Sequence, residues 1–187
     1  VALALSVLGR SSESKTAASA IGRRLTIVMT YVINLGVPPL LFAQVLYGRA
    51  LYTSSVLIGF WWILVIFLLM GCYWLLYRFS AALEAGGRAW ATGLGAWVAA
   101  ATIAKIYSSN MTLMLRPEVW HGMYSASGFG MLLPTGDPTL MPRWAFMMTG
   151  GFAITGLWLL YLSGRSSFAA PDKRYLARLG GRLAVIG

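Results

Sequence analysis

Residues 55–79 read SVLIGFWWILVIFLLMGCYWLLYRF, a run with no acidic side chain and a single basic one, Arg78. A bilayer core about 30 Å thick is crossed by roughly 20 helical residues, because each residue advances a helix by about 1.5 Å. This stretch is therefore long and apolar enough to be a membrane span, and it decides the class of the protein.

Three further stretches of about twenty mostly apolar residues also lack an acidic side chain. They cover residues 25–47, 90–107 and 144–163. Hydrophobic residues make up 58% of the chain and charged residues 11%, whereas soluble domains typically have about 45–50% and about 25%. We therefore predict an all-α integral membrane protein, with about four transmembrane helices in a single domain over residues 1–187.

The first residues form an apolar stub, residues 1–9, that is too short to cross a bilayer. A secretory signal would carry basic residues before its apolar stretch, and none is present. We expect the stub to be the tail of an earlier span, so that the chain is a piece of a longer polytopic protein. An internal echo agrees with this expectation, since residues 8–12 resemble 163–167. Chance similarity between short helix ends is the alternative.

Basic residues in the connecting segments indicate which side of the membrane faces the cytoplasm. Eleven of the fifteen Lys and Arg residues lie before the first span, at the end of span two, between spans two and three, or after span four. The other four are Arg49, Lys105, Arg116 and Arg143. We predict that both ends face the cytoplasm of a bacterial inner membrane and that residues 109–143 form an external loop. Because most of the basic residues cluster on one side of the spans, the net charge of +10 does not indicate nucleic acid.

The first span contains a predicted break at residues 36–39. Pro38 and Pro39 lack an amide hydrogen, and their rings press against the carbonyls four residues back. Carbonyls released in hydrocarbon need another partner. We expect a kinked helix, and two interpretations stay open: a purely structural kink, or a polar notch in which Asn34 and Gln44 help to bind a quinone or another ligand.

Small residues mark the predicted packing faces of spans three and four. Gly95 and Ala99 are four residues apart, a spacing that lets helix backbones approach closely, and Gly93 precedes them. Gly150 and Gly151 repeat the pattern in span four, together with Gly156. We predict that these faces pack inside the bundle or against another membrane subunit.

The external loop carries the most specific residues. Trp120, His121 and Tyr124 belong to an amphipathic stretch that can lie on the membrane surface, between Arg116 and Arg143. We predict that these five residues form a partner interface. Lys105 has two interpretations, a side chain that reaches the interface or an ion pair with Glu118 or Asp137.

Metal and haem chemistry find little support in the sequence. His121 is the only histidine and Cys72 the only cysteine, so a haem b held by two histidines cannot be built from this chain alone. Haem ligation by His121 together with a methionine or a residue of a partner is a minor alternative to a simple hydrogen-bonding role. There is no Cys-x-x-Cys-His, glycine-rich phosphate loop or metal-ligand cluster. We therefore keep quinone as the main candidate cofactor, ahead of haem.

Several short motifs carry a resemblance to a class of known proteins. They are Gly36-Val37-Pro38-Pro39-Leu40-Leu41-Phe42, Leu46-Tyr47-Gly48, Tyr52-Thr53-Ser54-Ser55, Asn110-Met111-Thr112-Leu113-Met114 and Gly136-Asp137-Pro138-Thr139-Leu140. Residues 32–164 resemble polytopic inner-membrane proteins that accompany multihaem c-type cytochromes in anaerobic and delta-type proteobacteria. The resemblance implies a membrane anchor or quinone-side subunit. It would place a histidine after Pro142-Arg143-Trp144-Ala145, where this chain has Phe146.

The leading hypothesis is a membrane-embedded subunit of a bacterial respiratory electron-transfer complex. It would anchor a redox partner, such as a multihaem cytochrome c or an iron–sulfur subunit, contribute to a quinone site and not be catalytic alone. A secondary transporter with a broken helix at residues 36–39 is the alternative, although the spans lack a carboxylate for ion coupling. A non-redox assembly scaffold is a third.

Overall fold

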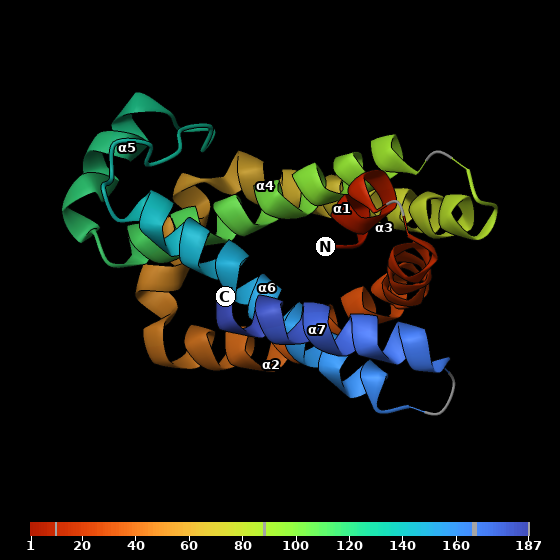
Figure 1. The fold of residues 1–187 in the computed structure, drawn as a ribbon. Coiled ribbons are helices and arrows are strands. Elements are labelled where there is room, and N and C mark those ends of the chain that lie inside the picture. Colours follow the sequence, from red (N-terminus) through yellow and green to blue (C-terminus); the bar gives the residue numbers. More distant parts are fainter. Residues whose placement is uncertain (10, 88, 166–167, 187) are drawn as a thin grey trace. The chain divides into compact units, whose positions relative to one another are not determined.

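The computed structural model describes residues 1–9, 11–87, 89–165 and 168–186, and all regular structure among them is helical. The predicted all-α class is confirmed. In chain order the helices are α1 (Ala2–Leu8), α2 (Ser12–Leu57), α3 (Gly59–Glu84), α4 (Trp90–Met114), the 3-10 turn η1 (Pro117–Val119), α5 (Trp120–Ala126), α6 (Leu140–Ser163) and α7 (Ala170–Ile186) (Figure 1). Arg10, Arg88, Ser166 and Ser167, which contribute to the charge count or the internal echo, lie outside the described residues.

Three helices of the described chain, α2, α3 and α6, are long and apolar enough to cross a membrane. None of the residues in the most apolar window of α2 is buried within the protein. Such a surface is stable only against lipid or another apolar surface, which is consistent with a bilayer environment. The fourth predicted span lies in α4, which contains many Ala and Gly residues and Lys105 and is not among these three helices. A count of four spans is therefore not confirmed.

Helix α2 continues through Pro38 and Pro39. Its departure from helical dihedrals falls at Tyr47, where φ is −122° and ψ is 26°. The kink predicted at residues 36–39 is therefore not confirmed. Proline fixes φ near −65°, a helical value, so its cost is a lost hydrogen bond and a ring contact rather than a forbidden dihedral. At Tyr47 the next residue is Gly48, which has little helix propensity.

Residue contacts divide the chain into two compact units. Unit 1 consists of Val1–Thr26, Tyr73–Trp97 and Phe146–Gly187, and unit 2 of Ile27–Cys72 and Val98–Ala145. By sequence, unit 1 holds eleven basic and three acidic residues, a net charge of +8, whereas unit 2 holds four and two, a net charge of +2. Contacts thus sort the basic residues into the same two groups as the predicted sides of the membrane.

Unit 1 is built around the buried side chains of Phe79, Leu159, Leu162 and Leu176. Helices α6 and α7 approach each other at backbone distance (Figure 1). A Cβ added at Gly156 would lie 2.5 Å from the backbone N of Ala184, and one added at Gly180 would lie 2.8 Å from the carbonyl oxygen of Gly156. The mutual absence of side chains is what permits this contact.

The predicted small-residue faces differ in what surrounds them. A Cβ at Gly93 would lie 2.7 Å from the ring of Phe79, and one at Gly95 would lie 3.1 Å from Leu75. Ala99 is buried. At Gly150 and Gly151 no atom lies within 4 Å of an added Cβ. Close packing of α6 therefore occurs at Gly156, one and a half turns further along the helix.

Unit 2 has its own apolar cluster at the junction of α2, α3 and α4. Its buried members are Leu57, Ile58, Ile106 and Leu113, and side chains of η1 and α5 pack against them. The Trp62 ring meets the Tyr107 ring edge-on, with 4.9 Å between their centres. This cluster supports the segment that follows α4.

Candidate functional site in the outer segment

The outer segment, residues 109–143, is named for the side on which the sequence predicts it. It begins inside α4, which continues to Met114, beyond the predicted end of the span at residue 107. Its first residues are polar yet buried: Asn110 is fully buried and Thr112 is 1% exposed. Asn110 Nδ2 and Thr112 Oγ1, together with Trp62 Nε1, have no hydrogen-bond partner among the described residues.

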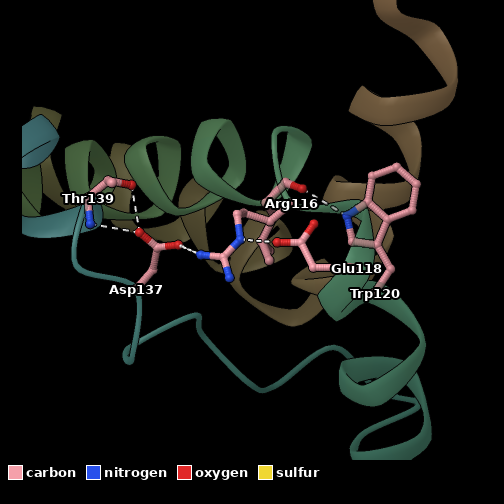
Figure 2. Close-up of polar contacts among 6 residues, drawn as sticks. Arg116, Glu118, Trp120, Asp137 and Thr139 are labelled. Carbon is pink, nitrogen blue, oxygen red and sulfur yellow. Dashed lines mark hydrogen bonds and ion pairs between the residues drawn. The ribbon is translucent and has the colours of Figure 1, made fainter.

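An ionic network joins the two ends of the outer segment (Figure 2). The Arg116 guanidinium pairs through Nε with Glu118 and through Nη1 with Asp137. The side chain of Asp137 is 5% exposed, whereas that of Glu118 is 58% exposed. Asp137 Oδ1 also accepts hydrogen bonds from the Thr139 backbone N at 2.7 Å and hydroxyl at 2.6 Å. The network thus connects residues 21 positions apart.

The same contacts determine the protonation of the network. The Thr139 hydroxyl and backbone N–H, and then the Arg116 cation, hold the pKa of Asp137 below its ordinary value. The hydrogen bond from Arg116 likewise lowers the pKa of Glu118, and that carboxylate raises the pKa of Arg116. All three groups are therefore charged at neutral pH.

Two tryptophans and one glycine hold the outer segment against the helices of unit 2. Trp120 Nε1 donates to the carbonyl of Leu113 at 2.8 Å (Figure 2), and Trp61 Nε1 donates to that of Met131 at 2.8 Å. Gly130 has φ +64°, and a Cβ there would lie 2.5 Å from the backbone N of Gly59. Only glycine suits both this conformation and this close approach.

A pocket of about 460 Å³ lies where the end of α2 meets α5, and we call it the Tyr52 pocket. It is lined by Tyr52, Thr53, Val56, Leu57, Trp120, His121 and Tyr124. Its volume falls within the roughly 300–1,000 Å³ of small-molecule pockets. Hydroxyl and imidazole groups around an aromatic wall can hydrogen-bond a ring that stacks there. Three predicted interface residues, Trp120, His121 and Tyr124, are brought together here.

A second pocket, the Thr112 pocket, adjoins the ionic network and has a volume of about 340 Å³. Apolar side chains form most of its wall, and Arg116 and Asp137 lie at its polar end. Its lining residues are Thr112, Leu113, Arg116, Val119, Met123, Leu132, Leu133, Pro134, Thr135, Gly136 and Asp137. The unpartnered Thr112 hydroxyl is its most unusual feature.

The predicted quinone residues lie elsewhere on α2 and line neither pocket. Asn34 is exposed, and its Nδ2 donates to the carbonyl of Thr30 at 3.0 Å. Pro38 and Pro39 are exposed, and Gln44 is partly exposed. Their role therefore stays a prediction.

Two basic residues that the sequence analysis named, Arg143 and Lys105, form no ion pair with this network. Arg143 lies in the first turn of α6, half-buried, outside the network and both pockets. The carboxylates of Glu118 and Asp137 pair with Arg116 and not with Lys105. Among the described residues no three His, Cys, Asp or Glu side chains converge.

Sequence reasoning missed Tyr52 and the joint role of Arg116 and Asp137. The signal for Tyr52 was its place just before the second predicted span, where aromatic residues of the membrane interface gather. The turn Gly136-Asp137-Pro138 gave Asp137 a fixed place but no partner.

No protein-family model, curated protein or solved structure matches this chain. The described chain is all-helical, with three helices long and apolar enough to cross a membrane and a folded, braced segment between two of its long helices. Function is therefore argued from that segment.

Proposed function

We propose that this chain is a membrane-embedded docking subunit of a bacterial respiratory electron-transfer complex. Its apolar helices hold it in the bilayer, and the outer segment binds a redox partner. The observation that carries the proposal is the bracing of that segment by Arg116, Asp137, Trp61 and Trp120.

Bracing favours a docking role because a preorganised surface loses little conformational freedom on binding. Large apolar side chains remain exposed on the braced segment: Phe129 is 88% exposed, Tyr124 61% and Met131 55%. Aromatic residues of this kind supply much of the binding energy at protein interfaces. A partner that covers them gains apolar burial without having to order the segment first.

The redox character of the partner rests on the resemblance described above. A multihaem cytochrome c or an iron–sulfur subunit is the partner class it implies, and the chemistry would reside in that partner. For a quinone contribution there are two alternatives, the α2 residues Asn34, Gln44, Pro38 and Pro39, or the Tyr52 pocket with His121. The Tyr52 pocket is favoured by its volume and by its hydrogen-bonding groups.

The test is recovery of partner proteins with the tagged full-length protein from native membranes in a mild detergent. We expect a haem or iron–sulfur protein to copurify, seen in the visible spectrum and identified by mass spectrometry. Phe129→Ser with Tyr124→Ser should lower its recovery about tenfold or more, since truncation of a single hot-spot residue typically costs about 2 kcal/mol or more.

Val185→Ser is the matched control, because Val185 is also 88% exposed but lies on α7 in unit 1. It should leave recovery unchanged. Recovery of no redox protein would refute the electron-transfer role. Equal loss in the control and in the outer-segment variant would refute the assignment of the docking face.

A further inference from the structure

Arg24 lies between two pockets of unit 1. The first, of about 710 Å³, is lined by Lys15, Thr16, Ser19, Ala20, Arg23, Arg24, Leu83 and Phe168. The second, of about 440 Å³, is lined by Arg24, Trp158, Tyr161, Leu162 and Arg165. We call the two together the Arg24 site.

Only one of the four basic groups that line this site, Arg23, pairs with a carboxylate among the described residues. Arg23 pairs with Glu84 at 3.2 Å. Arg24 instead donates Nη1 to the carbonyl of Ala20 at 2.9 Å, and Arg165 donates to the Tyr161 hydroxyl at 2.8 Å. Within the described part of the chain, neither has a carboxylate at ion-pair distance, and no lining residue of either pocket is acidic. Arg24, Arg165 and Lys15 can therefore bind an anion.

The surroundings of these cations are those of a membrane interface. Trp158 and Tyr161 lie in the last turns of α6, a helix able to cross the bilayer, and Arg165 follows its end. Their rings pack against each other, with 5.4 Å between centres, and the Arg165 guanidinium lies over the Tyr161 ring. Trp and Tyr side chains gather at the depth of lipid headgroups. A ligand here meets positive charge on one side and an apolar helix face on the other.

We propose that the Arg24 site binds the phosphate of an anionic phospholipid. Arg24 and Arg165 hold the phosphate, Lys15 adds charge at its edge, and the acyl chains follow the exposed face of α6 near Trp158. Basic pockets at the cytoplasmic ends of membrane helices bind anionic headgroups in this way. The site belongs to unit 1 and is independent of the docking role proposed for the outer segment.

The test measures lipid retained by the purified full-length protein after reconstitution and detergent washing. The probes are vesicles of phosphatidylcholine alone or mixed with phosphatidylglycerol, and native mass spectrometry counts the bound lipid. The wild-type protein should retain phosphatidylglycerol in preference to phosphatidylcholine. Arg24→Gln with Arg165→Gln should lower the affinity for phosphatidylglycerol about 30-fold. The attraction of one Arg to an anionic lipid surface corresponds to about fivefold in affinity.

Two control variants separate a built site from diffuse charge. Arg174→Gln with Arg182→Gln removes the same charge from α7, outside both pockets, and should retain the lipid. Arg24→Lys with Arg165→Lys keeps the charge and should retain most of the bound lipid. Equal loss in both Gln pairs would overturn the proposal. So would displacement of the lipid by millimolar inorganic phosphate alone, which would indicate a soluble phosphate ligand.

A third measurement covers the case in which the Gln pair fails to fold. In the wild-type protein, salt should release phosphatidylglycerol more readily than it releases phosphatidylcholine, because salt screens charge. Equal salt sensitivity of the two lipids would overturn the proposal. Recovery of a redox partner should persist in the folded Gln pair, so a failure of the lipid site and a failure of docking are distinguishable.

Discussion

Replacement of Gly156 by alanine should destabilise the α6–α7 contact. The added Cβ would lie 2.5 Å from the backbone N of Ala184 and 2.7 Å from the carbonyl oxygen of Gly180. Ordinary van der Waals contact begins at 3.4 Å, so α7 must retreat by about 0.9 Å. Because the opposing atoms are backbone, a change of rotamer cannot relieve the clash.

The expected loss is about 1–3 kcal/mol, the usual cost of forcing an extra carbon into a packed site. Gly150→Ala is the matched control on the same helix, since no atom lies within 4 Å of its added Cβ. There the substitution should stabilise the helix by about 0.5–1 kcal/mol, because alanine has less conformational freedom to lose than glycine. The two substitutions add the same atoms and should have opposite signs.

Reversible unfolding of the protein in mixed micelles with increasing sodium dodecyl sulfate, followed by tryptophan fluorescence, measures both effects. Gly181→Ala provides a second control on α7, with no atom within 4 Å of its added Cβ. If Gly156→Ala proved as harmless as Gly150→Ala, the close backbone contact between α6 and α7 would be wrong.

Three further predictions concern the outer segment. Because the pKa of Asp137 is lowered, its charge stabilises the fold at pH values above its ordinary pKa of 3.8. This contribution is lost as the pH falls through the lower pKa of the folded protein. Resistance of the outer segment to a protease active in acid should drop in that pH range. Asp137→Asn should remove that drop. Thr112→Val should be neutral or raise stability by about 1–3 kcal/mol, since it removes a buried hydroxyl without a partner. Trp61→Phe should cost about 0.5–1.5 kcal/mol by losing the hydrogen bond to Met131, seen as faster hydrogen exchange in the segment.

For each of these three predictions a specific result would contradict the reasoning. A protease profile in acid that is the same with Asp137→Asn would place the transition on other groups. Destabilisation by Thr112→Val would show that its hydroxyl has a partner, such as water or a ligand in the Thr112 pocket. Unchanged exchange near Met131 in the Trp61 variant would show that the indole does not hold the segment.

Much of the helical framework could be predicted from the sequence. The stretch at 55–79 became α3 (Gly59–Glu84), and that at 144–163 became most of α6 (Leu140–Ser163). Both follow from apolar side chains over about 20 residues, a property summed along the chain. Helix α7 was missed, although Leu176, Leu179 and Leu183 recur at helical spacing.

Predictions from single prolines and glycines were less reliable than those from long apolar stretches. Two prolines predicted a break at residues 36–39 of α2, yet the non-helical dihedrals within this helix lie at Tyr47. Glycines at 150, 151 and 156 predicted a packing face, and of these three only Gly156 lies in close contact with another helix. A glycine shows only that a backbone can approach, and the position of the opposing helix decides where it does.

In the candidate site, too, the sequence predicted which neighbouring residues lie together but not which distant residues meet. An amphipathic stretch placed Trp120, His121 and Tyr124 together, because they are close neighbours in the chain. Nothing local in the chain assigned Asp137 to Arg116 over Lys105, or brought Tyr52 to His121. Those pairings depend on how α2, α4 and α5 meet within unit 2.

By itself, then, the sequence determined the membrane class and the separation of eleven basic residues from four, because both depend on composition along each segment. Only the tertiary structure decided that Arg116 bridges two carboxylates, that Gly156 meets Gly180, and that Arg24 joins two basic pockets. Contacts between residues distant in the chain arise from packing, and their energies are not carried by either residue alone.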